Sequence, residues 1–161
     1  MPDLNTNLLG YWALEEASGV NRADATGNGH EFRDDDIANP IGQAVGKVGN
    51  AASYLSVTGR LFCDSLPART GDMTWAGWFN PRSGTGTGGQ GLIARSLDFQ
   101  LSWALQGLGF TERFSWTVYG PTTAPNIIIE VTPDVWHFVV CEYDSTALVS
   151  RMKIDDGAWS S

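Results

Sequence analysis

The sequence predicts an all-β protein, an antiparallel sandwich of two sheets, and three observations lead to this prediction. The chain of 161 residues contains 19 glycines, well above the usual share of about 7%. It also contains seven Trp, seven Phe and four Tyr, residue types that favour strands, while only 17% of its residues are charged. Short runs of alternating apolar and polar residues are separated by turn residues, and helix signals are almost absent.

Alternation with a period of two predicts the individual strands. The opening strand is expected over Leu8–Leu14. A later strand places Val139, Cys141 and Tyr143 on one face, and the strand after it carries Met152 and Ile154. The other expected strands are 73–80, 99–106, 114–119 and 127–131. Turn residues cluster at 18–19, 27–29, 81–91, 119–125 and 155–157. With no internal repeat and no linker, residues 1–161 are expected to form one domain.

The charge of the chain limits its partners. Ten Lys and Arg against 18 Asp and Glu give a net charge of −8, which repels phosphate backbones and anionic lipid surfaces. We therefore expect neither nucleic-acid nor membrane binding. No apolar run approaches the ~20 residues of a transmembrane helix, and residues 1–10 lack the basic and apolar parts of a signal peptide. Composition leaves the localisation unknown.

The sequence offers little support for catalysis or for a nucleotide cofactor. Gly84–Gly89 matches G-x-G-x-x-G, but a strand-like segment follows it, so a hairpin loop is the better interpretation. Glu142 and Asp144 could share a strand face as a glycosidase acid pair, yet Asp144 falls at a turn and no third acid follows. Cys63 and Cys141 match no metal or redox spacing, and we expect two buried free thiols. No catalytic residue is predicted.

The segment from Asp24 to His30 is the candidate binding site for a metal ion. Gly27 and Gly29 allow the backbone to turn so that carbonyl oxygens point inward, and Asp24 adds a carboxylate. Oxygen ligands on a curled loop suit Ca²⁺. The alternative is an Asx-type turn with left-handed glycines and no metal, and residue types alone favour this alternative.

Six segments resemble, in order, laminin-G-like domains of the concanavalin-A-like jelly-roll superfamily. The resemblance rests on Leu9-Gly-Tyr-Trp-Ala-Leu-Glu-Glu-Ala-Ser-Gly19, Asp24-Ala-Thr-Gly-Asn-Gly29, Val45–Ala52, Thr74–Pro81, Trp136–Asp144 and Ile154-Asp-Asp-Gly157. It implies a two-sheet jelly roll and one structural calcium held by a side-chain oxygen of Asp24 and backbone oxygens of Asn28 and His30. Members usually continue past the last hairpin, so we expect a C-terminally short domain that lacks its last strands.

The resemblance implies a non-catalytic binding module for carbohydrate or protein ligands, extracellular or virion-associated, and not an enzyme. The ligand-binding residues are unknown from the sequence, although Tyr119, Trp159 and the loop at Asn126 could contribute. The alternative is a structural or assembly protein, a virion or surface-layer component without a small ligand. A glycoside hydrolase is the third hypothesis, weakened by the incomplete acid pair.

The expected missing strands predict self-association. They would leave unpaired backbone groups at a sheet edge, and Leu8–Leu14 carries no charge or proline that would block pairing with another chain. We therefore expect a homo-oligomer, a two-fold dimer with Leu8–Leu14 or the tail near Trp159 at the contact.

Overall fold

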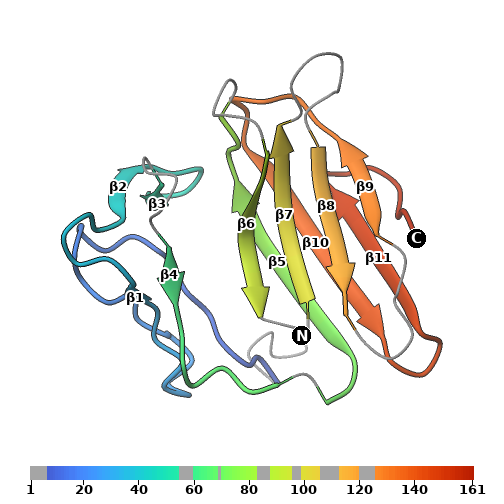
Figure 1. Ribbon diagram of the computed structural model, residues 1–161, viewed down its shortest axis with the longest axis horizontal. Helices are drawn as coiled ribbons and strands as arrows, with labels where there is room; N and C mark the ends of the chain where they lie inside the picture. Colours follow the sequence, from blue (N-terminus) through green and yellow to red (C-terminus); the bar gives the residue numbers. More distant parts are fainter. Residues whose placement is uncertain are drawn as a thin grey trace. The chain divides into compact units, whose positions relative to one another are not determined.

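The protein is built from antiparallel strands, and no helix occurs in the described residues. The computed structural model describes residues 7–54, 60–68, 70–82, 88–95, 99–105, 113–119 and 126–161. Within them, no helix is long and apolar enough to cross a membrane. Contacts divide the chain into two compact units, residues 1–67 and 68–161 (Figure 1).

In the described part of the first unit, two short sheets are connected by long irregular segments. Strand β1 (Arg33–Asp34) pairs with β4 (Leu61–Phe62), and β2 (Gly42–Val45) pairs with β3 (Asn50–Ser53). Its buried side chains include Ile41, Arg22 and Asp24, so polar groups form much of its interior. Backbone and side-chain hydrogen bonds between loops therefore hold a large part of this unit.

The second unit is a two-sheet sandwich. One sheet has the order β11-β10-β5 and the other the order β6-β7-β8-β9, both with antiparallel neighbours throughout. The strands are β5 (Met73–Phe79), β6 (Gly88–Arg95), β7 (Phe99–Leu105), β8 (Arg113–Val118), β9 (Ile127–Glu130), β10 (His137–Asp144) and β11 (Val149–Ile154). The all-β prediction and the antiparallel strands are confirmed, whereas the jelly-roll topology stays a prediction.

The core of the second unit lies between its two sheets. Alternation puts every second residue of a strand into this layer, which explains why these strands were readable from the sequence. The buried side chains are Phe114, Trp116, Val118, Ile127, Val139, Cys141, Tyr143, Met152 and Ile154. The indole Nε1 of Trp116 donates a hydrogen bond to the Glu142 carbonyl across the layer, at 3.3 Å.

The prediction of an opening strand over Leu8–Leu14 is wrong. No residue of this segment belongs to a strand, and Leu14 has a φ of +59°. Its backbone is instead bound by the loop that follows: the Tyr11 amide donates to Asp24 Oδ1, and the Tyr11 carbonyl accepts from the Ala25 amide. Because the N–H and C=O groups of Tyr11 already have these partners, they need no neighbouring strand.

The structure also revises two smaller expectations. The turn expected over 81–91 ends earlier, since β6 begins at Gly88 and its glycines pair by backbone alone with β7. The intervening residues 83–87 lie outside the described residues, as does most of the cluster at 119–125. Cys141 is buried and Cys63 only half-buried, and both thiols are free.

The last hairpin of the sequence forms a turn and returns to the sheet. Asp155 takes a φ of +53°, and the Gly157 amide donates to the Ile154 carbonyl at 3.1 Å. The chain then runs back along β11, where Ser160 and Met152 exchange two backbone hydrogen bonds of 2.9 Å. The outer edge of β11 is therefore partly covered.

Candidate functional site

Asp24 is the centre of the predicted metal loop, and its carboxylate accepts hydrogen bonds from three residues. Oδ1 accepts from the Tyr11 amide at 3.1 Å, the Thr26 amide at 3.0 Å and the Thr26 hydroxyl at 2.6 Å. Oδ2 accepts from the His30 amide at 3.1 Å. One side chain thus joins the opening segment to both ends of the loop.

These donors determine the charge of Asp24. Burial opposes ionisation, but the hydrogen bonds from Thr26, Tyr11 and His30 favour the carboxylate and lower its pKa to about 2. Gly27 and Gly29 have φ values of +80° and +78°, the left-handed conformation that lets the loop curl around the carboxylate. Asp24 is therefore an ionised carboxylate that accepts hydrogen bonds mainly from backbone N–H groups.

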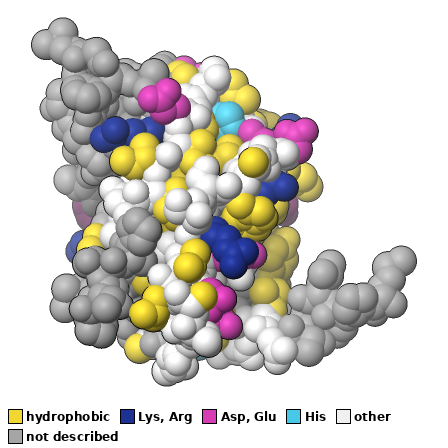
Figure 2. All heavy atoms as spheres, turned by 90° about the vertical axis from the view of Figure 1, so that its right-hand side faces the viewer, with side chains coloured by type: hydrophobic (Ala, Val, Ile, Leu, Met, Phe, Trp, Pro, Cys, Tyr) yellow, Lys and Arg dark blue, Asp and Glu magenta, His cyan; other side chains and the backbone are white. Residues whose placement is uncertain are grey.

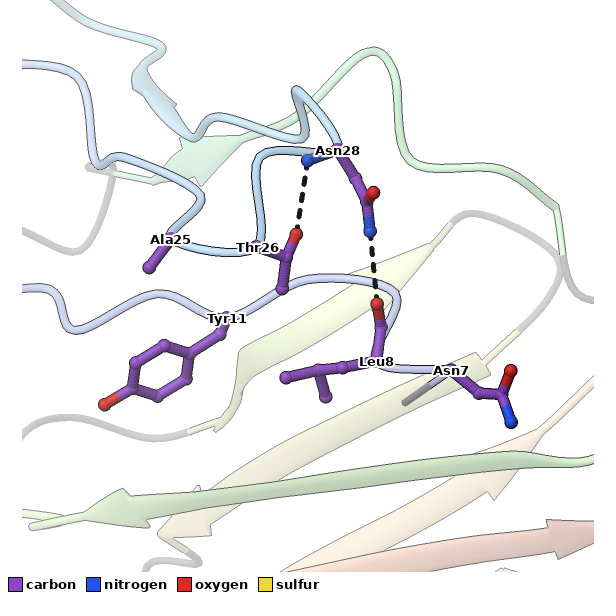
Figure 3. Close-up of a pocket in the computed structure, with 6 residues that line it drawn as sticks. All are labelled: Asn7, Leu8, Tyr11, Ala25, Thr26 and Asn28. Carbon is purple, nitrogen blue, oxygen red and sulfur yellow. Dashed lines mark hydrogen bonds between the residues drawn. The ribbon is translucent and has the colours of Figure 1, made fainter. Parts of the chain in front are cut away.

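Asn28 and His30 lie in the same loop and bind the chain around it. Figure 3 shows the Asn28 amide reaching the opening segment, where Nδ2 donates to the carbonyl oxygens of Leu8 and Leu9 at 3.1 and 2.9 Å. The His30 carbonyl accepts from the Trp12 indole at 2.5 Å. The side chains in Figure 3 border an open hollow of about 440 Å³, but its Thr26 and Asn28 groups are occupied by these internal bonds.

The oxygen atoms of this loop do not match the ligands that Ca²⁺ requires. Ca²⁺ takes about six to eight oxygen ligands, whereas the loop supplies one carboxylate that N–H and O–H groups already occupy. Among the described residues, no group of three or more His, Cys, Asp or Glu side chains is placed to hold a metal ion. Asp24, Asn28 and His30 do come together, and calcium there stays a prediction.

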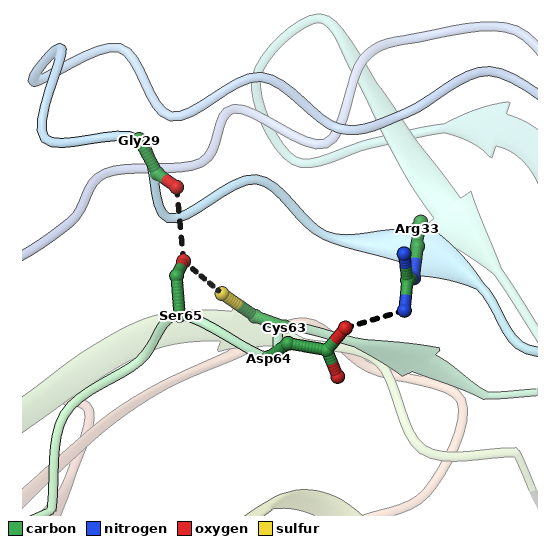
Figure 4. A network of polar contacts seen from close by, with 5 residues as sticks. All are labelled: Gly29, Arg33, Cys63, Asp64 and Ser65. Carbon is green, nitrogen blue, oxygen red and sulfur yellow. Dashed lines mark hydrogen bonds and ion pairs between the residues drawn. The ribbon is translucent and has the colours of Figure 1, made fainter.

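A second polar network continues from this loop toward β4. Figure 4 shows Ser65 donating its hydroxyl to the Gly29 carbonyl at 2.9 Å, with the Cys63 thiol 3.3 Å from the same hydroxyl. Beside it, the Arg33 guanidinium forms an ion pair with Asp64. Each polar group in this network has a partner within the first unit, which indicates a structural role for it.

The outward face of the β11-β10-β5 sheet carries an aromatic pair with one exposed ring. Trp78 on β5 lies opposite Phe138 on β10, and their ring centroids are 5.1 Å apart at an interplanar angle of 50°. Trp78 is 43% exposed even though its neighbours Trp75 and Phe79 point toward the core. A large ring therefore stands on the solvent side of a rigid sheet.

Polar and charged side chains continue this face beyond the aromatic pair. Glu142 lies between Thr74 on β5 and Arg151 on β11 in the same cross-strand row. Next to this row is a hollow of about 220 Å³ that Asp72, Asp144 and Arg151 help to line. The face thus combines two aromatic rings with carboxylate, hydroxyl and guanidinium groups, the types that recognise sugar hydroxyls.

Glu142 and Asp144, the two carboxylates considered for glycoside hydrolysis, have different roles in the structure. Asp144 Oδ1 accepts from the amides of Thr146 and Ala147 at 2.9 and 2.7 Å, which closes the turn after β10. Asp72 Oδ1 accepts from the amide and the hydroxyl of Ser145, and these bonds lower the Asp72 pKa. Glu142 is the remaining carboxylate of the row. The interpretation of Asp144 as a turn residue is supported.

The aromatic and amide residues that the sequence suggested as ligand contacts lie elsewhere. Tyr119 and Trp159 are 37% and 43% exposed, on the segments after β8 and β11. Asn126 uses its Oδ1 to accept from the hydroxyls of Ser115 and Thr117. Trp78 was missed as a candidate, although its place on the opposite strand face from Trp75 was a usable signal.

Comparison with models of known protein families, with characterised proteins and with solved structures gave no significant match. The functional argument therefore depends on the residues of this chain.

Proposed function

We propose that this protein is a non-catalytic carbohydrate-binding module whose ligand lies on the outward face of the β11-β10-β5 sheet. The carrying observation is the exposed ring of Trp78, held 5.1 Å from the half-buried ring of Phe138 on the adjacent strand. A sugar ring presents an apolar face of C–H groups, which packs against an aromatic ring without requiring either partner to change conformation.

A polar row farther along the same face, beyond Ala76 and Val140, would supply direction and specificity to a ligand that spans both rows. Thr74, Glu142 and Arg151 offer hydroxyl, carboxylate and guanidinium groups about 13 Å along the strands from the aromatic pair. Glu142 and Arg151 place both signs of charge in one row, which suits a neutral ligand better than a polyanion. Figure 2, which shows the side of the molecule on the right of Figure 1, likewise has acidic and basic side chains close together among hydrophobic ones.

Binding without turnover also fits the polar groups of this face. Two of its three carboxylates, Asp72 and Asp144, accept hydrogen bonds from turn residues. Glycoside hydrolysis requires one carboxylic acid and one carboxylate on opposite sides of a bound sugar. Glu142 alone does not supply such a pair, so we assign no catalytic step.

A glycan-array screen followed by titration tests the proposal. Wild-type protein should retain at least one glycan, and Trp78→Ala should weaken that binding about tenfold, equal to about 1.4 kcal/mol. Trp159→Ala is the matched control, because Trp159 has the same 43% exposure but lies on the C-terminal tail. Absence of glycan binding, or equal losses in both variants, would overturn the assignment to this face.

A further inference from the structure

Asn28 and Gly29 form the only Asn-Gly pair of the sequence, and both are exposed in the turn that follows Asp24. An asparagine can react with its own chain, because the next backbone nitrogen attacks the side-chain carbonyl carbon and closes a five-membered ring. Any side chain on the next residue hinders that attack, and Gly29 has none. A Cβ added at Gly29 would also meet no other part of the described chain within 4 Å. The loop therefore leaves room for this ring to form.

The atom that this reaction expels is the atom that holds the opening segment. Nδ2 of Asn28 donates to the carbonyl oxygens of Leu8 and Leu9, at 3.1 and 2.9 Å, and Figure 3 shows the first of these bonds. The two acceptors lie 20 and 19 residues earlier in the chain, so both bonds are tertiary contacts. A ring closure that removes Nδ2 removes both contacts in one step.

We propose that Asn28 is a self-modification site, where the loss of ammonia releases Leu8 and Leu9 from the loop. The Gly29 nitrogen gives up its proton and bonds to Cγ of Asn28, while the bond from Cγ to Nδ2 breaks and Nδ2 leaves as ammonia with that proton. Water then opens the cyclic imide at either carbonyl, which gives aspartate or isoaspartate. One water is consumed and one ammonia is released, and the reaction needs no oxidant, reductant or partner.

Both products put a carboxylate where the amide stood. A carboxylate has no hydrogen to donate, so its oxygens repel the Leu8 and Leu9 carbonyls, which are acceptors as well. Isoaspartate also lengthens the main chain by one carbon ahead of His30, whose amide donates to Asp24 Oδ2 at 3.1 Å. Because neither product returns to asparagine, the release is permanent, and the released fraction increases with the age of the protein.

The opening segment has a second attachment at Tyr11, which provides a readout. Its amide donates to Asp24 Oδ1 at 3.1 Å, and its carbonyl accepts from the Ala25 amide at 2.8 Å. Once the Asn28 bonds are lost, Tyr11 separates from the loop more often, since fewer bonds hold the same segment. Hydrogen exchange of the Tyr11 and Ala25 amides therefore measures the release.

Peptide mapping by mass spectrometry tests the reaction in warm, mildly alkaline buffer. Asn28 should convert faster than Asn50, an exposed asparagine of the same unit that precedes an alanine. Gly29→Ala and Gly27→Ala form a matched pair, because these glycines have φ values of +78° and +80° and equal space around them. Only Gly29→Ala adds a methyl group beside the attacking nitrogen, and it should slow the reaction about tenfold, or about 1.4 kcal/mol in the barrier.

The same comparison in urea keeps the test valid if alanine at a positive φ unfolds the first unit. Ring closure in the unfolded chain depends on the adjacent residues alone, so Gly29→Ala should still be slower than Gly27→Ala. Equal rates at Asn28 and Asn50 in the folded protein would overturn the self-modification. Equal rates in the two glycine variants would do the same, because the attacking nitrogen would then not be that of residue 29.

Hydrogen exchange tests the release. Asn28→Asp reproduces the aspartate product, and the Tyr11 and Ala25 amides should exchange about tenfold faster in it, as expected for the loss of two hydrogen bonds. Asn50→Asp, on β3, adds the same charge to the same unit and should leave both amides at the wild-type rate. Unchanged exchange in Asn28→Asp, or equal acceleration in both variants, would show that the Asn28 amide does not hold the opening segment.

Discussion

His137 Nδ1 lies 2.8 Å from Asp155 Oδ2, while Nε2 of the same ring lies 2.8 Å from the Thr132 carbonyl. Both ring nitrogens therefore lie within hydrogen-bond distance of an oxygen acceptor. Asp155 Oδ1 also accepts from the Phe138 amide. The pair therefore ties the turn after β11 to the first residues of β10.

A double-mutant cycle measures this connection. His137→Phe keeps an aromatic ring against Phe114 but leaves Asp155 without its ring donor, and should lower the free energy of unfolding by about 1–3 kcal/mol. Asp155→Asn tolerates the positive φ and retains an acceptor for Phe138, so its effect should be smaller. Urea unfolding should give a coupling of about 0.5 kcal/mol or more. Additive effects would contradict the pairing.

The lowered pKa of Asp24 predicts that the folded protein loses stability in acid. Its pKa falls from 3.8 to about 2 on folding, so its contribution is complete above about pH 4 and disappears as the pH falls toward 2. Because its hydrogen bonds are only partly buried, we discount the full shift and expect on the order of 1 kcal/mol. Denaturant unfolding from pH 6 to pH 2 checks this.

Two variants separate Asp24 from the other carboxylates in that experiment. Asp24→Ala should be less stable at pH 6 and should lose the acid-dependent part of the wild-type curve. Asp36→Ala should keep most of it, since the hydrogen bonds of Asp36 are exposed to solvent. Equal acid dependence in wild type and Asp24→Ala would show that other groups control the transition.

Calcium binding at the same loop has a different signature. A ligand that binds only the folded chain raises the melting temperature with its concentration, so Ca²⁺ held by Asp24 would stabilise wild type and not Asp24→Ala. The hydrogen bonds alone predict that Asp24→Ala melts lower even in chelator. Thermal unfolding with excess EDTA and with millimolar Ca²⁺ distinguishes the two effects. A wild-type melting temperature that ignores Ca²⁺ ends the calcium hypothesis.

The two thiols should react at different rates. Burial raises the pKa of Cys141 to about 12, which leaves almost no thiolate at neutral pH, whereas Cys63 is half-buried after β4. A thiol reagent should therefore label Cys63 in the folded protein and both residues in denaturant. Mass spectrometry after labelling identifies the site, and Cys63→Ser should abolish labelling of the native chain. Rapid labelling of Cys141 would indicate that the sandwich opens readily.

Strands of the second unit were predictable because each carries its own signal. In 113–118 and 137–144 the buried residues alternate strictly, and alternation is a local property of the sequence. Leu8–Leu14 shows similar residue types, yet its backbone partners are Asp24, Ala25 and the Asn28 amide. Pairing between a backbone and distant side chains leaves no periodic trace in either segment.

The candidate sites were predictable only in part, for a chemical reason. A carboxylate on a glycine-containing loop attracts a cation or a set of N–H groups equally well, so the sequence identified Asp24 without identifying its partners. Trp78 was not singled out because the second face of the strand, with Thr74 and Ala76, is itself partly apolar. Only the burial of the strand within its sheet shows that Trp78 lies on the outward face.

Arg22 is the residue of the first unit for which we expect the largest effect of a conservative substitution. Its side chain is fully buried, with Nη1 donating to the carbonyls of Ala17 and Val20 and Nη2 to that of Ile41 at 2.9 Å. Lysine keeps the charge but cannot place its ammonium group at all three carbonyls, so Arg22→Lys isolates the geometry of the fork.

Arg22→Lys should destabilise the first unit by about 1–3 kcal/mol, the usual penalty for buried polar groups that lose their partners. Arg22→Met, which leaves all three carbonyls without this donor, should cost more. Amide hydrogen exchange reports on this unit directly, through the Arg22 and Phe32 amides that bond across their isolated bridge. Exchange there should accelerate in both variants, while the Val139 and Cys141 amides of the sandwich core keep wild-type protection. Unchanged exchange at Phe32 in Arg22→Lys would mean that charge, and not the three-carbonyl geometry, keeps Arg22 buried.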